Sequence, residues 1–252
     1  MAITVNSGGK KIIRALFFPA NALMSRLGVA WKFALLGLMS LVAIAVVVYS
    51  LFASLNQAIS FSQRELKGIA LIGPISRTVQ AMQQHRGLSS GFLGGNEAMR
   101  EWRTGKEKET TVALRALEEK LPSSLATGED FRRIRAGWER IRKEGLNWMA
   151  EENFAAHTRL IELIRLFEMV AADEYALTLD PEINTYYLID TAINKLPHTL
   201  EYLAQIRGYG TGLLARKQAT GQQKIEMTTM IAELGVALED LNINRNSSAP
   251  TV

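Results

Sequence analysis

The sequence predicts an all-α protein, with an N-terminal transmembrane helix followed by an antiparallel helical bundle of the four-helix type. Three observations predict this class. An uncharged run of apolar residues extends from Phe33 to Leu55. Beyond it, apolar residues recur at spacings of three and four, which is the period of an amphipathic helix and not of a strand. The chain has no cysteine, so packed apolar surface and not disulfides must stabilise the fold.

The run from Phe33 to Leu55 predicts the transmembrane helix. At a helical rise of about 1.5 Å per residue it spans roughly 35 Å, enough to cross the hydrocarbon core of a bilayer. Residues 1–32 have no acidic residue and five basic ones: Lys10, Lys11, Arg14, Arg26 and Lys32. Because basic segments stay in the cytoplasm, we expect residues 1–32 to be cytoplasmic and the following domain to lie across the membrane. A cleaved signal peptide fits less well, since the apolar run exceeds its usual core of roughly 7 to 15 residues.

The charge of the chain is distributed unevenly. The formal net charge is +4, but residues 33–252 contain 24 Lys plus Arg against 25 Asp plus Glu. The basic character therefore comes from the segment before the span, where it marks topology and can contact anionic lipid headgroups. The domain beyond has no basic excess, which argues against a nucleic-acid partner.

We expect residues 56–241 to form a helical domain with short loops, built as one bundle or as two stacked or pseudo-repeated halves. The spanning helix is predicted to continue to Leu93, with a kink or break at Pro74. Gly94-Gly95-Asn96 predicts a turn. A helix from Glu97 to Lys120 should follow and end before Pro122, which cannot continue it.

Further helices are predicted in the second half of the domain. One has Thr127 as N-cap, Asp130 at N3 and an apolar stripe: Phe131, Ile134, Trp138, Ile141 and Trp148. The next should extend from Asn153 to Leu179 and stop at Asp180-Pro181. A segment from Tyr186 to Ile206 follows, with a kink at Pro197, and the last helix should extend from Gly221 to Leu241. Residues 242–252 are polar and are expected to form a flexible tail.

An internal repeat has one copy in each half of the predicted domain. Residues 84–93 (QHRGLSSGFL) align without a gap to residues 205–214 (QIRGYGTGLL), giving the shared pattern Q-x-R-G-x-x-x-G-[FL]-L. Glycines four apart on a helix clear a flat groove in which another helix can approach closely. Each interior glycine costs about 1 kcal/mol relative to alanine, so four of them indicate such a use. Chance similarity of two glycine-rich helices is the alternative.

The repeat also supplies the candidate ligand-binding residues. Arg86 and Arg207 occupy equivalent positions, and the arginine fork matches flat anions such as carboxylate or nitrate. If both side chains point inward, they frame a site for a small anion. The candidate residues are Arg86, Arg207, Gln84, Gln205 and Tyr187. The alternative is that each arginine pairs with a carboxylate on the surface, where such pairs contribute roughly 0 to 1 kcal/mol.

Two blocks of the chain resemble a known receptor class. Residues 83–96 (QQHRGLSSGFLGGN) and residues 179–190 (LDPEINTYYLID), followed by Leu196-Pro197 and by Arg207-Gly208-Tyr209-Gly210, resemble the sensor region of bacterial methyl-accepting chemotaxis proteins and related transmembrane signalling proteins. The Q-x-R-G-x-S element is also similar to that of nitrate- and nitrite-sensing receptor domains, which are all-helical. The resemblance covers about residues 32–216.

The resemblance implies a homodimeric, periplasmic input module, anchored in the bacterial inner membrane. Such a module binds a small solute, for which an anion is one candidate, and this binding shifts a transmembrane helix. Two alternatives stay open: the input region of a histidine kinase or of a diguanylate cyclase, and a membrane-anchored helical scaffold without a ligand. The cytoplasmic output of these receptors is not in this sequence, so the chain is expected to be either the front of a receptor or a stand-alone relative.

An enzyme is not expected. The three histidines, His85, His157 and His198, do not have the spacing of metal ligands, and no cysteine is present. No serine or threonine lies in a nucleophile elbow, and without strands there is no phosphate loop of the usual kind. We therefore predict no catalytic residues, no metal and no cofactor.

Overall fold

A computed structural model describes residues 28–177 and 183–248. It divides into two compact units, residues 1–61 and 62–252, which are treated separately. Every regular element among the described residues is a helix, so the all-α prediction is confirmed. The helix α2 (Val29–Leu93) contains the predicted transmembrane run and continues through Pro74 without a break. Among the described residues, α2 is the one helix long and apolar enough to cross a membrane.

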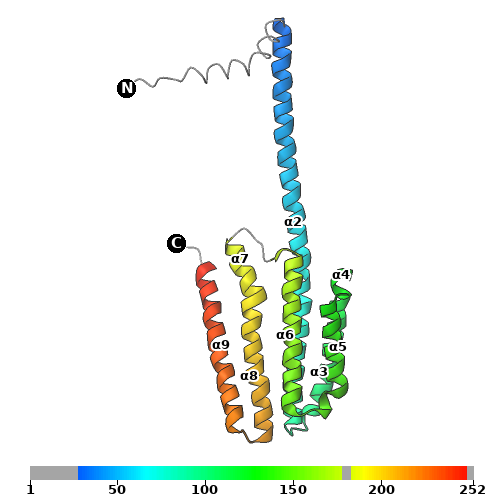
Figure 1. Ribbon diagram of the computed structural model, residues 1–252, viewed down its shortest axis with the longest axis vertical. Coiled ribbons are helices and arrows are strands. Elements are labelled where there is room, and N and C mark those ends of the chain that lie inside the picture. Colours follow the sequence, from blue (N-terminus) through cyan, green and yellow to red (C-terminus); the bar gives the residue numbers. More distant parts are fainter. Residues whose placement is uncertain (1–27, 178–182, 249–252) are drawn as a thin grey trace, which may run out of the picture. The chain divides into compact units, whose positions relative to one another are not determined.

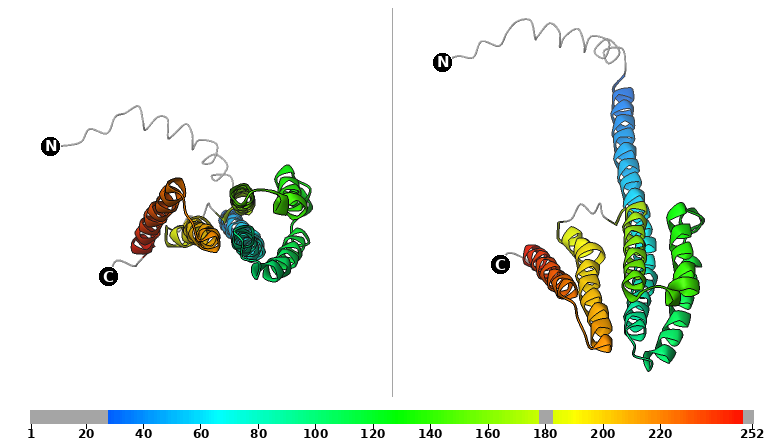
Figure 2. Two further views of the ribbon diagram at one scale, coloured as in Figure 1. Left: turned by 90° about the horizontal axis from the view of Figure 1, so that it is seen from below. Right: turned by 60° about the horizontal axis from the view of Figure 1, so that its bottom comes forward.

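Besides the C-terminal part of α2, the second unit contains all the other described helices, in an up-and-down order (Figure 1). Their bounds are α3 (Met99–Glu118), α4 (Ser123–Ala126), α5 (Glu129–Glu144), the 3-10 turn η1 (Gly145–Asn147), α6 (Ala150–Glu174), α7 (Ile183–Asp190), the π-helical turn η3 (Thr191–Lys195), α8 (Leu196–Arg216) and α9 (Gly221–Ser248). Seen end-on, the lower part of α2 and α6 lie between α3 and α5 on one side and α8 and α9 on the other (Figure 2). We call these the α3–α5 side and the α8–α9 side.

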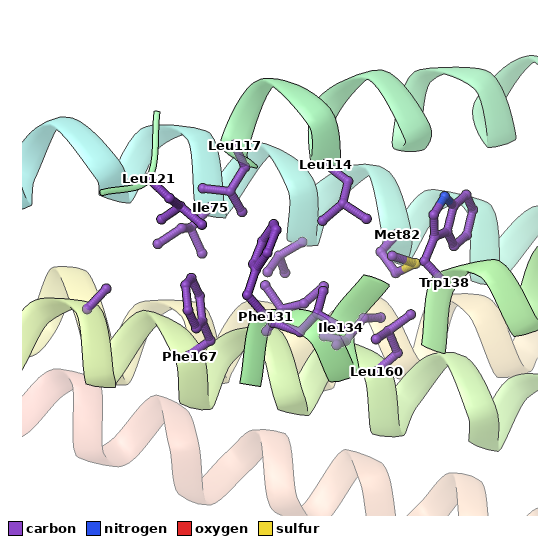
Figure 3. Packing of buried hydrophobic residues seen from close by; sticks show 14 of the residues in the cluster. Ile75, Met82, Leu114, Leu117, Leu121, Phe131, Ile134, Trp138, Leu160 and Phe167 are labelled. Carbon is purple, nitrogen blue, oxygen red and sulfur yellow. The ribbon is translucent and has the colours of Figure 1, made fainter. Parts of the chain in front are cut away.

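The apolar core belongs to the α3–α5 side, where α2, α3, α5 and α6 form an antiparallel four-helix bundle. Phe131, Ile134, Trp138 and Ile141 of the predicted stripe are all buried. They pack against apolar side chains of the three neighbouring helices, among them Ile75, Met82, Leu117 and Phe167 (Figure 3). The 3.6-residue period of α5 therefore places its apolar face on the bundle axis, as expected.

Two predicted boundaries are confirmed in outline. The turn at Gly94-Gly95-Asn96 ends α2: Gly95 has a φ of +105°, and the Asn96 N–H donates to the Gly91 carbonyl at 3.0 Å. Only glycine adopts such a φ without strain, which explains why the helix ends here. The helix α3 ends at Glu118, just before the predicted stop at Pro122.

Other boundaries were predicted wrongly. Thr127 does not cap α5; its hydroxyl donates to the Ser123 carbonyl at 2.8 Å, because the short α4 intervenes and Gly128 precedes α5. Pro197 begins no separate helix: the chain is helical from Ile183 through the π-helical turn η3 to Arg216, and the irregular segment is η3, which ends two residues before the proline. The last helix continues past Leu241 to Ser248. The helix α6 ends at Glu174, and the predicted stop at Asp180-Pro181 lies outside the described residues.

Candidate functional site

The two copies of the repeat meet where α2 crosses α8. Successive contacts join Gly87 to Gly208 and Ser90 to Gly212, so the two helices run in parallel. A Cβ at Gly208 would lie 3.4 Å from the Gly87 Cα and 3.3 Å from the Phe154 ring, and one at Gly212 would collide with the Ser90 hydroxyl. The glycines thus allow a close helix approach, as the repeat predicted, and the partner of each copy is the other copy.

Arg86 is fully buried beside this crossing. Its Nη1 lies 2.6 Å from Glu201 Oε1 and its Nη2 lies 3.3 Å from Oε2, so the guanidinium contacts both carboxylate oxygens. Nη1 also donates to the Thr158 hydroxyl at 2.9 Å, and the group lies over the Phe154 ring at 4.9 Å. A buried charge of this kind is tolerated because it is paired and hydrogen-bonded.

The Glu201 carboxylate receives two further hydrogen bonds. Gln83 Nε2 donates to Oε2 at 2.8 Å, and Gln205 Nε2 donates to Oε1 at 2.9 Å. Glu201 is itself 4% exposed. Arg86, Gln83 and Gln205 therefore surround a planar two-oxygen anion that the chain itself supplies.

A pocket of about 690 Å³ is lined mainly by α2 and α8, and Glu168 is its one lining residue from α6. That volume is typical of small-molecule sites. Its apolar lining residues include Leu196, Leu200 and Leu203 of α8. Its polar lining residues are Ser76, Arg77, Gln80, Gln83, Gln84, Glu168 and Arg207. Arg207 is exposed, and within the described parts of the chain no ion pair joins it to a carboxylate.

Glu168 is the buried acidic group of this pocket. It is 2% exposed, and its Oε1 has no hydrogen-bond partner among the described residues. Burial raises the pKa of Glu168 from 4.5 to about 7, although Arg165 and a hydrogen bond from Ser76 oppose the increase. Near neutral pH the pocket therefore contains a carboxyl group that can exchange a proton.

A second buried polar cluster lies on the α3–α5 side. His157 Nδ1 is 2.8 Å from the Asn153 carbonyl, so it carries a proton, and His157 Nε2 must accept from His85 Nδ1 at 2.8 Å. Burial lowers the pKa of His157 to about 3 and that of His85 well below 6.5. The pair is neutral at physiological pH and packs on the Trp138 ring, 5.1 Å from His85. No described group of three or more His, Cys, Asp or Glu residues could hold a metal ion.

Comparison with models of known protein families identifies the family of this chain. A family described as nitrate and nitrite sensing matches residues 77–249, which is more than half of the chain and includes both copies of the repeat. The chain belongs to the nitrate- and nitrite-sensing family. This is a sensor family and not a family of enzymes. No curated protein and no solved structure matches the chain.

In this nitrate- and nitrite-sensing domain the predicted site residues divide into three groups. Arg86 and Gln205 belong to the buried network around Glu201. Gln84 and Arg207 line the pocket. Tyr187 lies on α7, where its ring packs against Tyr186 at 5.6 Å, and it is not among the pocket-lining residues. The sequence offered two alternatives, that both arginines point inward or that both pair with carboxylates on the surface, and neither describes the pair. Arg86 is buried and pairs with Glu201, whereas Arg207 is exposed.

The sequence analysis missed three polar residues of the candidate site. Glu201 lies one helical turn before Gln205, a spacing that places both on one face, and this signal could have been used. Gln83 was passed over for its neighbour Gln84 because only Gln84 belongs to the repeat. Glu168 carries no sequence signal, since its importance comes from its burial.

Proposed function

We propose that this chain is the sensor region of a membrane-anchored bacterial signalling protein and that it binds nitrate or nitrite in the pocket beside Arg207. One observation carries the proposal: an exposed arginine and a neutral amide, Gln84, line a pocket at the crossing of the two repeat copies. A guanidinium donates two parallel hydrogen bonds to a planar oxyanion, and amides add hydrogen bonds without a competing charge. Arg77 lines the same pocket, so two arginines face one buried carboxyl, Glu168, whose pKa of about 7 keeps it partly protonated near neutral pH.

The membrane topology belongs to the proposal as well. The apolar residues of α2 before the sensor unit are exposed in the single chain, which suits a helix surrounded by lipid. The five basic residues before it favour a cytoplasmic N-terminus and a periplasmic sensor. The resemblance to methyl-accepting chemotaxis proteins favours a chemoreceptor as the parent signalling protein. Ligand binding would then displace α2 relative to the membrane.

A homodimer is the proposed working state. The exposed faces of α8 and α9 carry large apolar side chains, among them Leu214, Ile225, Ile231 and Val236. Large apolar side chains exposed on two helices that pack side by side favour a face that contacts another chain. The proposed partners are thus a small anion, the membrane and a second copy of the chain.

Titration calorimetry of the full chain in lipid nanodiscs tests the anion proposal. We expect nitrate and nitrite to bind, and chloride to bind far more weakly. Arg207→Ala should weaken nitrate binding at least tenfold, since it removes the guanidinium that forms the bidentate contact. The matched control is Arg133→Ala, which removes an exposed arginine paired with Glu129 on α5. Arg86→Ala is a poor test, because it leaves the Glu201 carboxylate buried without its counter-charge.

Two results contradict the proposal. Absence of heat with either anion favours a helical scaffold without a ligand. Nitrate binding that is unchanged in Arg207→Ala means that the anion binds elsewhere.

A further inference from the structure

The repeat relates two arginines whose surroundings differ in one decisive way. Arg86 reaches across the helix crossing to Glu201, which lies six positions before Arg207 on α8. The residue six positions before Arg86 on α2 is Gln80. If the ungapped alignment of the two copies is extended by four residues toward the N-terminus, Gln80 is the counterpart of Glu201.

The parallel crossing turns this sequence relation into a spatial one. Gly87 contacts Gly208, and these are equivalent residues of the two copies. A parallel pair that crosses at equivalent residues has local two-fold symmetry, so Arg207 should reach toward Gln80 as Arg86 reaches Glu201. Consistent with this, Gln80 and Arg207 both line the pocket.

The second difference between the two copies is the size of one side chain near each arginine. Gln83 donates to Glu201, and its counterpart in the extended alignment is Ala204, which also lines the pocket. On the Arg207 side the carboxylate is thus replaced by a neutral amide, and the hydrogen-bonding amide by a methyl group. The first change removes the internal anion, and the second makes room.

We infer that the pocket at Arg207 binds an external planar anion in the position that Glu201 occupies at Arg86, and that the neutral Gln80 is the residue that keeps this position available. The inference rests on the proposed function and deepens it. Because the internal occupant at Arg86 is a carboxylate, the site should accept small carboxylates such as formate as well as nitrate and nitrite. Gln80 thereby sets the specificity for an anion.

The variant Gln80→Glu tests this assignment in the full chain in nanodiscs. It installs the missing carboxylate, which should pair with Arg207 and weaken nitrate, nitrite and formate binding at least tenfold, as measured by calorimetry. Gln80→Met, which is neutral and of similar size, should weaken binding by less. Gln218→Glu adds the same charge at an exposed position outside the pocket lining and should change little.

A measurement without ligand keeps the inference testable by itself. If the new carboxylate pairs with Arg207, Gln80→Glu should raise Tm in the parent chain and lower it, or leave it unchanged, in an Arg207→Met background. Nitrate binding that survives Gln80→Glu, or a Tm change that is the same in both backgrounds, overturns the inference. If nitrate and nitrite fail to bind the parent chain while formate binds and the Tm coupling is present, the proposed function fails and the inference stands.

Discussion

The two sides of the α2–α6 pair are built on different principles. On the α3–α5 side, large side chains such as Phe131 and Ile134 are completely buried in one continuous core. On the α8–α9 side, Leu200 and Leu203 remain 49% and 53% exposed, and the closest contacts involve glycines and a charged network. One side is held together by apolar area, and the other mainly by hydrogen bonds and close backbone approach.

This difference indicates which helices of the domain can move relative to one another. Apolar cores pack tightly and resist rearrangement, whereas regions with few buried apolar contacts open locally at a lower free-energy cost. The π-helical turn η3 next to Pro197 adds an irregular segment at the edge of the pocket. A ligand at the pocket would therefore move α8 against α2 more easily than α3 or α5.

The largest expected effect tests whether the α3–α5 side is the stabilising one. Phe131→Ala should lower the free energy of unfolding by about 3 to 5 kcal/mol, because it removes a fully buried ring and leaves a cavity. On the other side, Leu203→Ala should cost less than about 1 kcal/mol, since the side chain is half exposed. Chemical denaturation of both variants measures this difference, and equal losses would remove the contrast.

The second prediction concerns the charged network that replaces a core on the α8–α9 side. Glu201→Ala should destabilise the chain by about 3 kcal/mol, because Arg86 stays buried without a counter-charge. Glu201→Gln keeps an acceptor for the guanidinium and should cost less. If Thermofluor or denaturant unfolding shows both variants to be as stable as the parent, the network contributes no stability and the contrast between the sides becomes one of packing alone.

The sequence predicted the α3–α5 side better than the α8–α9 side, for a physical reason. The stripe of Phe131, Ile134 and Trp138 follows the helical period, which is a local property, and burial follows from it. The turn at Gly95 was equally predictable from the sequence, because only glycine adopts its φ without strain. The interior of the bundle could therefore be outlined from one helix at a time.

The candidate site depends on contacts that no local pattern contains. Arg86 and Glu201 are separated by 115 residues, and only the crossing of α2 and α8 brings them together. The repeat correctly indicated that small residues permit a close approach, but it could not say that the two copies approach each other. For the same reason the different environments of Arg86 and Arg207 were not foreseen.

The smallest expected effect concerns Glu168, because burying its carboxylate in the pocket lowers the stability of the domain as the group ionises. The pKa of Glu168 is raised from 4.5 to about 7, so the folded chain binds more protons than the unfolded chain between these values. The contribution of Glu168 to stability is therefore lost as pH rises from 4.5 to about 7, by roughly 2 to 3 kcal/mol in total. Glu168→Gln should abolish this loss, so that its stability relative to the parent increases from pH 5 to pH 8 in urea unfolding. A constant difference across that range would mean that the carboxyl keeps an ordinary pKa, and that the pocket is open enough to hydrate it.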